Sequence, residues 1–263
     1  MTKLLFGSVA LIVMSVAAWA ADMPVKAPVL KAPPPAPIYS WTGCYIGGNI
    51  GGGGSRIDVT RVRTPGGFAV NENYGSADGR GWLGGGQIGC DFQTGAIVFG
   101  VQGMFDWSRI KSDHTIPITF LPPFTTFTYH TDIRRIFTLT GRVGFAMQPA
   151  ALIYVKGGGA WKRENLQVRG VVPITFLSET ADNVEFRGWT IGGGFEYGFA
   201  PNWSLFVEGN YLDFGTKRIA FIAAPGTIGA GTVGDIMDQT QRVTTILGGI
   251  NVRFGGAPVV ARY

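Results

Sequence analysis

The chain has 263 residues and a formal net charge of +5 at pH 7, yet only 15% of its residues are charged. Soluble domains usually carry about 25% charged residues, so this composition argues against a soluble exported enzyme. Two cysteines permit one disulfide and exclude a disulfide-rich scaffold.

Residues 1–20 predict an export signal that is not part of the fold. Lys3 is followed by the apolar run 4–18, and the run ends in the small-x-small pattern Ala-Trp-Ala at 18–20. A membrane anchor is the alternative interpretation. The run is short for a membrane span, which favours export.

The segment 21–40 predicts an extended periplasmic tether. Its sequence ADMPVKAPVLKAPPPAPIYS holds six of the fifteen prolines. Proline has no amide donor and favours polyproline II, so this composition is typical of a spacer rather than a domain. Lys26 and Lys31 could contact an acidic partner, but a plain spacer is the preferred interpretation.

Past the tether, strand-like segments recur at regular intervals. Eight strands are predicted at 42–54, 80–93, 96–110, 132–147, 152–164, 184–199, 203–216 and 240–254. They are joined alternately by tight turns at 94–95, 148–151 and 200–202 and by long segments at 55–79, 111–131, 165–183 and 217–239. Short periplasmic turns and long extracellular loops are typical of outer-membrane barrels. The sequence therefore predicts an all-β fold, a transmembrane eight-stranded antiparallel up-and-down β-barrel at 41–254, followed by a C-terminal extension at 255–263.

Within the predicted strands, apolar and polar residues alternate. In 132–147, Phe137 and Leu139 share one face, and the opposite face is expected to carry Arg134, Thr138, Thr140 and Arg142. A soluble sandwich would turn such apolar faces inward and a barrel would turn them toward lipid, so alternation alone leaves both open. The export signal, the even strand count and the loop asymmetry favour the barrel. Tryptophans that suit interfacial girdles are Trp82, Trp107, Trp161, Trp189 and Trp203.

Glycine runs recur inside these strands. WTGCYIGGNIGGGG at 41–54, GWLGGGQIGCDF at 81–92 and GWTIGGGFEYGF at 188–199 all combine glycine with strand residues. A small tilted barrel curves sharply and has a crowded interior, and glycine relieves both constraints. No helix follows these runs, which argues against a phosphate-binding loop.

Side chains alternate between the two faces of a strand, and this alternation places four charged residues inside the predicted barrel at similar heights: Arg142, Lys156, Glu196 and Glu208. They could form a general acid/base pair of glutamates, an ion-selectivity filter or a buried salt-bridge network. Small barrels have just enough room for side chains, and two charges of each sign can neutralise one another. The network that fills the interior is the preferred interpretation. Asn49, Gln87 and Gln102 are expected at a comparable height on the first three strands.

The sequence predicts no catalytic, cofactor or metal site. His114 and His130 have no metal-ligand spacing, and the separation of Cys44 from Cys90 matches no zinc pattern. A lipid A-modifying enzyme remains the alternative, because both histidines lie beside aspartates at the edges of one long loop. No serine motif of the GxSxG kind accompanies them.

A shared segment, PITFL, occurs in two long loops at 117–121 and 173–177. Its β-branched and aromatic residues could form an adhesive patch, in which case the protein would be an adhesin. Strand extensions that pair above the membrane are the preferred interpretation.

The basic residues beside the predicted long loops do not indicate nucleic-acid binding. At the outer rim they would face lipopolysaccharide phosphates, although a solvated rim without a specific ligand is an equal alternative. They are Arg56, Arg61, Arg63, Arg80, Lys162, Arg163, Arg169, Lys217 and Arg218.

These segments together carry a family resemblance. YSWTGCYIGGNIGGG, GWLGGGQIGCDFQTGAIVFGVQGMFDW, GWTIGGGFEYGFAPNWSLFVEGNYLDFG and GGINVRF resemble the outer-membrane immunogenic, porin-like eight-stranded β-barrels of Gram-negative bacteria. The resemblance implies a surface-exposed, antigenic barrel in the cell outer membrane. It supplies no catalytic residue. We expect a monomer with a structural role and at most narrow passive pore activity, whose partners are the lipid bilayer and lipopolysaccharide.

Such barrels usually end on an aromatic residue that the outer-membrane assembly machinery reads. Phe254, which closes the last alternating strand, is the expected assembly signal. Tyr263 is terminal, but Pro258 interrupts the alternation before it.

The cysteine pair departs from the resemblance. If the first two strands pair across their loop with Gly54 opposite Arg80, then Cys44 lies opposite Cys90. Both would face outward near the periplasmic end. A cross-strand disulfide and two free lipid-facing thiols remain equally open.

Overall fold

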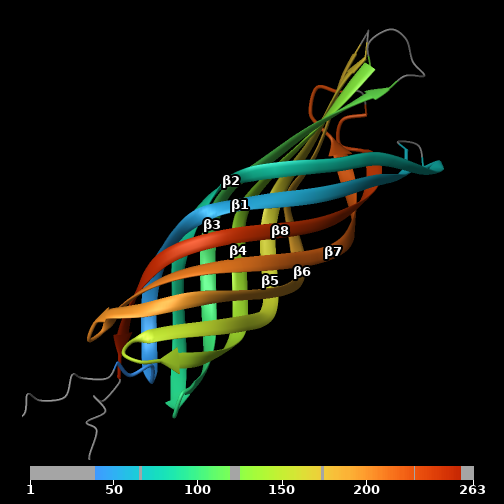
Figure 1. The fold of residues 1–263 in the computed structure, drawn as a ribbon. Coiled ribbons are helices and arrows are strands. Elements are labelled where there is room, and N and C mark those ends of the chain that lie inside the picture. The colour runs from blue at the N-terminus through green and yellow to red at the C-terminus, as the bar shows by residue number, and fades with distance from the viewer. Residues whose placement is uncertain (1–38, 65–66, 119–124, 173–174, 228, 256–263) are drawn as a thin grey trace, which may run out of the picture. The chain divides into compact units, whose positions relative to one another are not determined.

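A computed structural model describes residues 39–64, 67–118, 125–172, 175–227 and 229–255. Within them lie eight strands: β1 (Gly43–Arg63), β2 (Ala69–Thr94), β3 (Ile97–Ile118), β4 (Thr125–Met147), β5 (Ala151–Val172), β6 (Thr175–Ala200), β7 (Trp203–Ala223) and β8 (Val233–Phe254). Sequential strands pair antiparallel and β8 pairs with β1, so the sheet closes into a barrel (Figure 1). The predicted eight-stranded up-and-down barrel is confirmed. The described residues include no helix that is long and apolar enough to cross a membrane.

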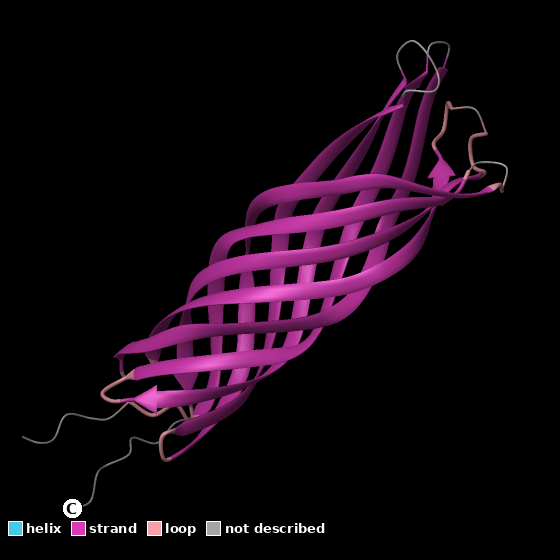
Figure 2. Cartoon of the chain, turned by 45° about the vertical axis from the view of Figure 1, so that its right-hand side comes forward, coloured by secondary structure: helices cyan, strands magenta, loops and turns pink. Residues whose placement is uncertain are grey.

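The register between β1 and β2 matches the prediction. Cys44 lies opposite Cys90 and Gly54 opposite Arg80. Short turns join β2 to β3, β4 to β5 and β6 to β7 at one end of the barrel, which Figure 2 shows as tight loops. We assign this end to the periplasm, because outer-membrane barrels place their short turns there.

The strands extend well beyond their predicted ends, and most residues of the four predicted long loops are strand. The β1–β2 ladder continues to Arg63 opposite Ala69, with irregular register above Asp58. Polar outward side chains in these extensions resemble loop composition. On the inward side, however, Ile57 and Val59 are buried, so the period of two persists above the membrane band.

Parts of the repeated PITFL segment belong to these extensions. Pro117 and Ile118 pair with β4, and residues 175–177 lie in β6. Residues 119–121 and 173–174 fall outside the described part of the chain. The preferred strand-extension interpretation is therefore confirmed for the described residues of each copy.

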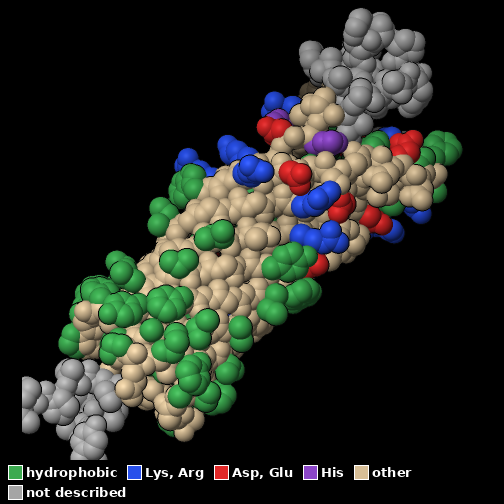
Figure 3. All heavy atoms as spheres, in the orientation of Figure 1, with side chains coloured by type: hydrophobic (Ala, Val, Ile, Leu, Met, Phe, Trp, Pro, Cys, Tyr) green, Lys and Arg blue, Asp and Glu red, His purple; other side chains and the backbone are tan. Residues whose placement is uncertain are grey.

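The outward face of the barrel is apolar over the part nearest the periplasmic turns. Figure 3 shows hydrophobic side chains over this part and charged side chains gathered toward the other end. Ile50, Val101, Leu139 and Val155 are each more than half exposed. Because lipid covers the outside of a membrane barrel, apolar side chains are expected on this outward face.

Arg134 was expected on the inward face, and that prediction is wrong. A register shift between Ile133 and Arg135 interrupts the β4–β5 ladder. A bulge places two successive residues on one side of a strand, so both Arg134 and Arg135 are exposed while Ile133 and Ile136 are buried.

Close backbone approach explains part of the glycine content. A Cβ added to Gly51 would lie 2.0 Å from the backbone oxygen of Ile246 on β8. A Cβ on the neighbouring Gly52 would point outward, with its nearest atom, the Gly81 oxygen, 3.9 Å away. Inward glycines of β1 therefore allow the strands to curve and approach, whereas outward ones are not sterically required.

Gly51→Ala is expected to lower the free energy of unfolding by about 1–3 kcal/mol, because the new methyl group collides with the backbone of β8. Urea-induced unfolding in lipid vesicles measures this difference. Gly52→Ala is the matched control and should unfold like the wild type. Equal stability of the two variants would contradict the steric explanation.

Candidate functional site

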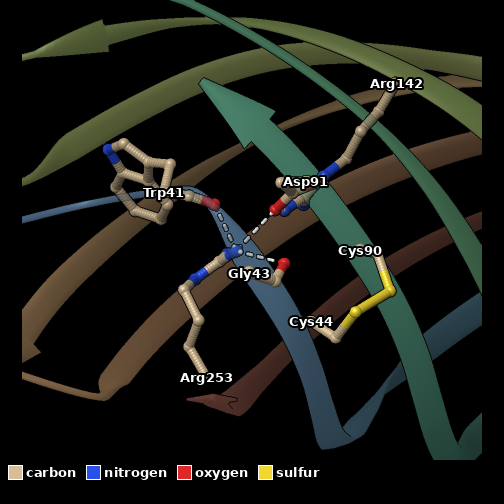
Figure 4. The surroundings of a disulfide bond; sticks show 7 residues. All are labelled: Trp41, Gly43, Cys44, Cys90, Asp91, Arg142 and Arg253. Carbon is tan, nitrogen blue, oxygen red and sulfur yellow. Dashed lines mark hydrogen bonds and ion pairs between the residues drawn. A yellow bond between two sulfur atoms is a disulfide. The ribbon is translucent and has the colours of Figure 1, made fainter. Parts of the chain in front are cut away.

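A first cluster of charges lies inside the barrel near its periplasmic end. Arg142 of β4 donates through Nε to Asp91 Oδ1 of β2 at 2.7 Å and through Nη1 to Glu196 Oε2 of β6 at 3.1 Å. Arg253 of β8 donates to Asp91 Oδ2 at 2.8 Å and to the Trp41 carbonyl at 2.6 Å (Figure 4). The four charged side chains are at most 3% exposed, so each charge is compensated by protein and not by water.

A second cluster lies beside the first and joins β3, β5 and β7. Lys156 Nζ donates to Glu208 Oε1 at 2.6 Å and to Gln102 Oε1 at 3.0 Å. Tyr154 donates its hydroxyl to Glu208 Oε2 at 2.9 Å. The Tyr154 ring also lies 5.0 Å from the guanidinium of Arg142. This cation–π contact links the two clusters.

The structure brings together the four charged residues singled out in the sequence, but they belong to two neighbouring clusters rather than to a single salt-bridge network. Arg142 contacts Glu196, and Lys156 contacts Glu208. Sequence reasoning missed Asp91, which bonds two arginines, and it did not assign Arg253 to the network. Because successive side chains of a strand point to opposite faces, the prediction that Cys90 faces outward would have placed Asp91 on the inward face.

The amides expected at this height also meet inside the barrel. Asn49 Nδ2 donates to Gln87 Oε1 at 2.9 Å, and Gln87 Nε2 donates to Asn251 Oδ1 at 2.8 Å. Asn251 in turn donates to Glu196 Oε1 at 3.0 Å. A continuous set of hydrogen bonds therefore runs from β1 to β6 through the barrel interior.

Apolar side chains fill the interior on the extracellular side of the polar clusters. Leu83, Met104, Val243 and Leu247 are each at most 3% exposed and belong to one buried cluster. At this height these side chains of the interior wall are therefore buried. Both the polar and the apolar layers are therefore built from side chains of the wall itself.

A buried ion pair lies among apolar residues beyond this layer. Lys162 Nζ lies 2.7 Å from Glu164 Oε2, and both side chains are 0% exposed. Gln241 donates to the other carboxylate oxygen at 2.6 Å. The expectation that Lys162 lies at the outer rim is wrong. It shares the inward parity of Lys156, whereas the sequence prediction followed its proximity to a loop.

The outer end of the interior holds another buried group of charges. Arg61 Nη2 lies 2.6 Å from Asp235 Oδ1, and Glu179 Oε2 accepts a hydrogen bond from the Asp235 amide at 3.0 Å. Burial raises the pKa of the Asp235 carboxyl, although the hydrogen bond from Arg61 opposes this shift. Burial likewise raises the pKa of Glu179. Arg61 is therefore paired with protein groups, as are Arg163 and Arg218 among the other basic residues predicted at the rim.

The end of the predicted tether and the first barrel residue pack into the periplasmic end of the barrel. Tyr39 and Trp41 are 9% and 1% exposed and pack with Val98, Leu152 and Tyr154. The Trp41 amide donates to Gln93 Oε1 at 3.0 Å. Residues 39 and 40, which the sequence prediction assigns to the tether, thus belong structurally to the barrel together with Trp41, because the rings of Tyr39 and Trp41 pack on its buried side chains.

Cys44 and Cys90 are joined by a disulfide across the first strand pair (Figure 4). The bond lies on the outward side, where Cys90 and its neighbours Ile46 and Ile88 are exposed. Cys44 also lies opposite Phe254 of β8. The crosslink therefore adjoins the seam at which the two ends of the sheet meet.

The histidines lie in the extracellular extensions. His130 Nδ1 contacts Asp113 Oδ1, and the two side chains are 42% and 63% exposed. A pocket of about 510 Å³ adjoins this pair, and the residues that line it include neither serine nor cysteine. His114 Nε2 lies 3.0 Å from the Tyr74 carbonyl. Within the described ranges, no cluster of histidine, cysteine, aspartate and glutamate side chains could hold a metal ion.

The closed barrel agrees with the family that the sequence matches. A family model described as outer membrane protein beta-barrel domain matches residues 6–254. The chain belongs to this family. The 31 kDa outer-membrane immunogenic protein of Brucella melitensis biotype 1 is 27% identical over 208 residues, which cover 77% of this chain and 83% of that protein. The 25 kDa outer-membrane immunogenic protein of Brucella abortus biovar 1 is 28% identical over 222 residues, which cover 82% and 86%.

These relatives confirm the predicted resemblance and the location in the outer membrane. Among solved structures, Neisserial surface protein A is 14% identical, with a TM-score of 0.34 and coverage of 81% of this chain and 98% of that one. OprG from Pseudomonas aeruginosa is 11% identical, with a TM-score of 0.43 and coverage of 83% and 99%. These two similarities concern the fold and carry no functional inference.

Asp91→Ala is expected to lower the free energy of unfolding by about 3–5 kcal/mol, because it leaves Arg142 and Arg253 short of a buried partner. Urea-induced unfolding in lipid vesicles measures the change. Asp238→Ala, which breaks an exposed pair with Arg218, is the matched control and should have little effect. An Asp91 variant as stable as the control would contradict a network that holds the barrel together.

Proposed function

We propose that this outer-membrane protein is a sealed structural barrel that displays its strand extensions as a surface antigen. The observation that carries this proposal is the burial of the interior at successive heights. Arg142 and Gln87 lie in the polar layer and Leu247 lies in the apolar layer beyond it, and each is at most 3% exposed. Side chains that line a water-filled pore would be exposed to water.

The electrostatics of the interior support the same conclusion. A conducting selectivity filter needs polar or charged groups that bind a passing ion and then release it. Here Glu196 and Glu208 are each engaged by cations and neutral donors at hydrogen-bond distance. A passing ion would have to break these bonds within a low-dielectric interior, which opposes permeation.

The surface-antigen part of the proposal rests on the strand extensions. The hairpins continue past the apolar band, and their outward side chains are polar or charged, including Arg63, Glu72 and Asp78. Two relatives are named immunogenic proteins, a property that we extend to this chain as a proposal. A monomer is proposed, because a closed barrel has no unpaired sheet edge in the membrane.

The enzyme alternative receives less support. The Asp113–His130 pair could act as a general base, yet the pocket beside it offers neither serine nor cysteine as a nucleophile. Threonine is present there, at Thr131 and Thr180, but the Thr131 side chain is buried. Clear turnover of lipid A by the purified protein would overturn the structural proposal.

In planar bilayers, the folded protein is expected to give no single-channel steps, because the buried layers block the interior. Conductance at 1 M salt measures this, with an established outer-membrane porin as positive control. Heat-modifiable gel migration of the same sample shows that the barrel is folded. Regular steps from folded protein would contradict the proposal of a sealed interior.

We also propose that Phe254 is the assembly signal, read by the outer-membrane assembly machinery. It is the last residue of β8 and is 50% exposed on the outward face. Ile250 and Ile246 precede it on the same face, at 43% and 66%. This outward apolar edge at the β1–β8 seam is accessible to a partner before the barrel closes.

Phe254→Ser is expected to reduce the amount of folded barrel in the outer membrane several-fold, because the last strand loses its aromatic terminus. Heat-modifiable protein in purified outer membranes measures this amount. Tyr263→Ser changes the terminal aromatic residue of the chain and serves as the matched control. Assembly that depends on Tyr263 and not on Phe254 would contradict the assignment.

A further inference from the structure

A groove of about 560 Å³ lies on the outer surface across β2, β3 and β4, where the apolar band meets the charged end of the barrel. Trp82 and Trp107 line it and are 52% and 58% exposed. Exposed tryptophans are typical of the interface between lipid tails and headgroups. The groove is therefore expected at the height of the headgroups of the outer leaflet.

Four cations line the same groove: Arg109, Lys111, Arg134 and Arg135. One of them, Arg134, is placed there by a bulge, whereas Arg109 and Lys111 follow the regular outward alternation of Trp107 along β3. The β3–β4 ladder shifts between Trp107 and Ile110, and the β4–β5 ladder shifts between Ile133 and Arg135. In a regular strand one of two consecutive arginines would point into the barrel, so the bulge turns an otherwise inward cation to the surface.

The cations of this groove lack acidic partners among the described residues. None of the four forms an ion pair with an acidic side chain there, in contrast to Arg187 and Arg218 elsewhere on the outer surface. Asp132 is the single acidic residue of the lining. Asp132 lies directly opposite Lys111 on β4, so the groove carries an excess of positive charge that the protein compensates only in part.

Cross-strand neighbours add to this excess. Arg135 lies directly opposite Arg163 on β5, and Lys111 lies directly opposite Arg80 on β2. Like charges that face one another across a sheet destabilise it. An anionic ligand between such residues would remove the repulsion, so the arrangement is favourable when the groove is occupied.

We propose that this groove binds the phosphate groups of lipopolysaccharide, with the guanidinium groups of Arg134 and Arg135 as the principal ligands. Planar guanidinium groups match phosphate oxygens with paired hydrogen bonds. Trp82 and Trp107 contact the lipid below the phosphates. The Arg109 guanidinium lies 5.5 Å from the centre of the Trp82 ring, which holds a third cation at the edge of the groove.

This lipid-binding site is a property additional to the sealed structural barrel proposed above. It depends on the location in the outer membrane, where the outer leaflet contains phosphorylated lipid, and not on whether the interior conducts. A conducting barrel could carry the groove unchanged, and a sealed barrel could lack affinity for the lipid. Lipid-binding and conductance measurements therefore test the two proposals separately.

The test uses the folded full-length mature chain in detergent and compares binding of phosphorylated lipid A, dephosphorylated lipid A and inorganic phosphate by native mass spectrometry. The double variant Arg134→Gln/Arg135→Gln removes the two principal cations. Arg187→Gln/Arg218→Gln removes the same number of outward charges from arginines that have acidic partners, and is the matched control. Heat-modifiable migration verifies that each protein is folded.

Wild type and control are expected to bind phosphorylated lipid A at least about tenfold more tightly than the double variant, since a charged hydrogen bond contributes about a factor of ten or more. Neither dephosphorylated lipid A nor free phosphate should bind to the wild type as tightly as phosphorylated lipid A does. Equal binding by the double variant and the control, or tight binding of dephosphorylated lipid A, would overturn the proposal. If the double variant does not fold, Arg109→Gln/Lys111→Gln provides the same comparison from β3.

Discussion

The closure of β8 onto β1 is the constraint on which the rest of the structure depends. The ladder between them runs from Cys44 opposite Phe254 to Arg63 opposite Ile236. A membrane offers no water to bond free amide and carbonyl groups, so a sheet that spans it must have no open edge. Closing only eight strands leaves an interior that side chains can fill. The inward glycines of β1 and the packed interior both follow from this narrow ring.

Charges that point into such an interior must be paired with one another. Asp91 on β2 bonds both Arg142 on β4 and Arg253 on β8, while Arg142 also bonds Glu196 on β6. Every second strand is therefore tied to the others across the interior as well as along the wall. Breaking one bond leaves a buried charge uncompensated, which costs more than the intact pair contributes. In the sealed barrel that we propose, the same network also opposes ion passage.

The sequence predicted the strands and their sidedness well because both depend on a period of two. The β1–β2 register followed from a single paired position, Gly54 with Arg80, and it holds through Cys44 and Cys90. Bulges break that period without a clear sequence signal, so the outward turn of Arg134 was missed. The strand extensions were read as loops, because their polar outward residues face water while only their inward residues, such as Ile57, remain apolar.

By itself the sequence determined the class of the fold, the membrane it enters and the side of the wall on which most residues lie. These properties follow from alternation, turn placement and the export signal, all of which are local patterns. Only the tertiary structure decided which charges meet. The partnership of Asp91 with Arg253, 162 residues apart, depends on closure of the ring. The cationic groove likewise depends on a bulge in β4, which turns Arg134 to the surface that Arg109 of β3 already faces.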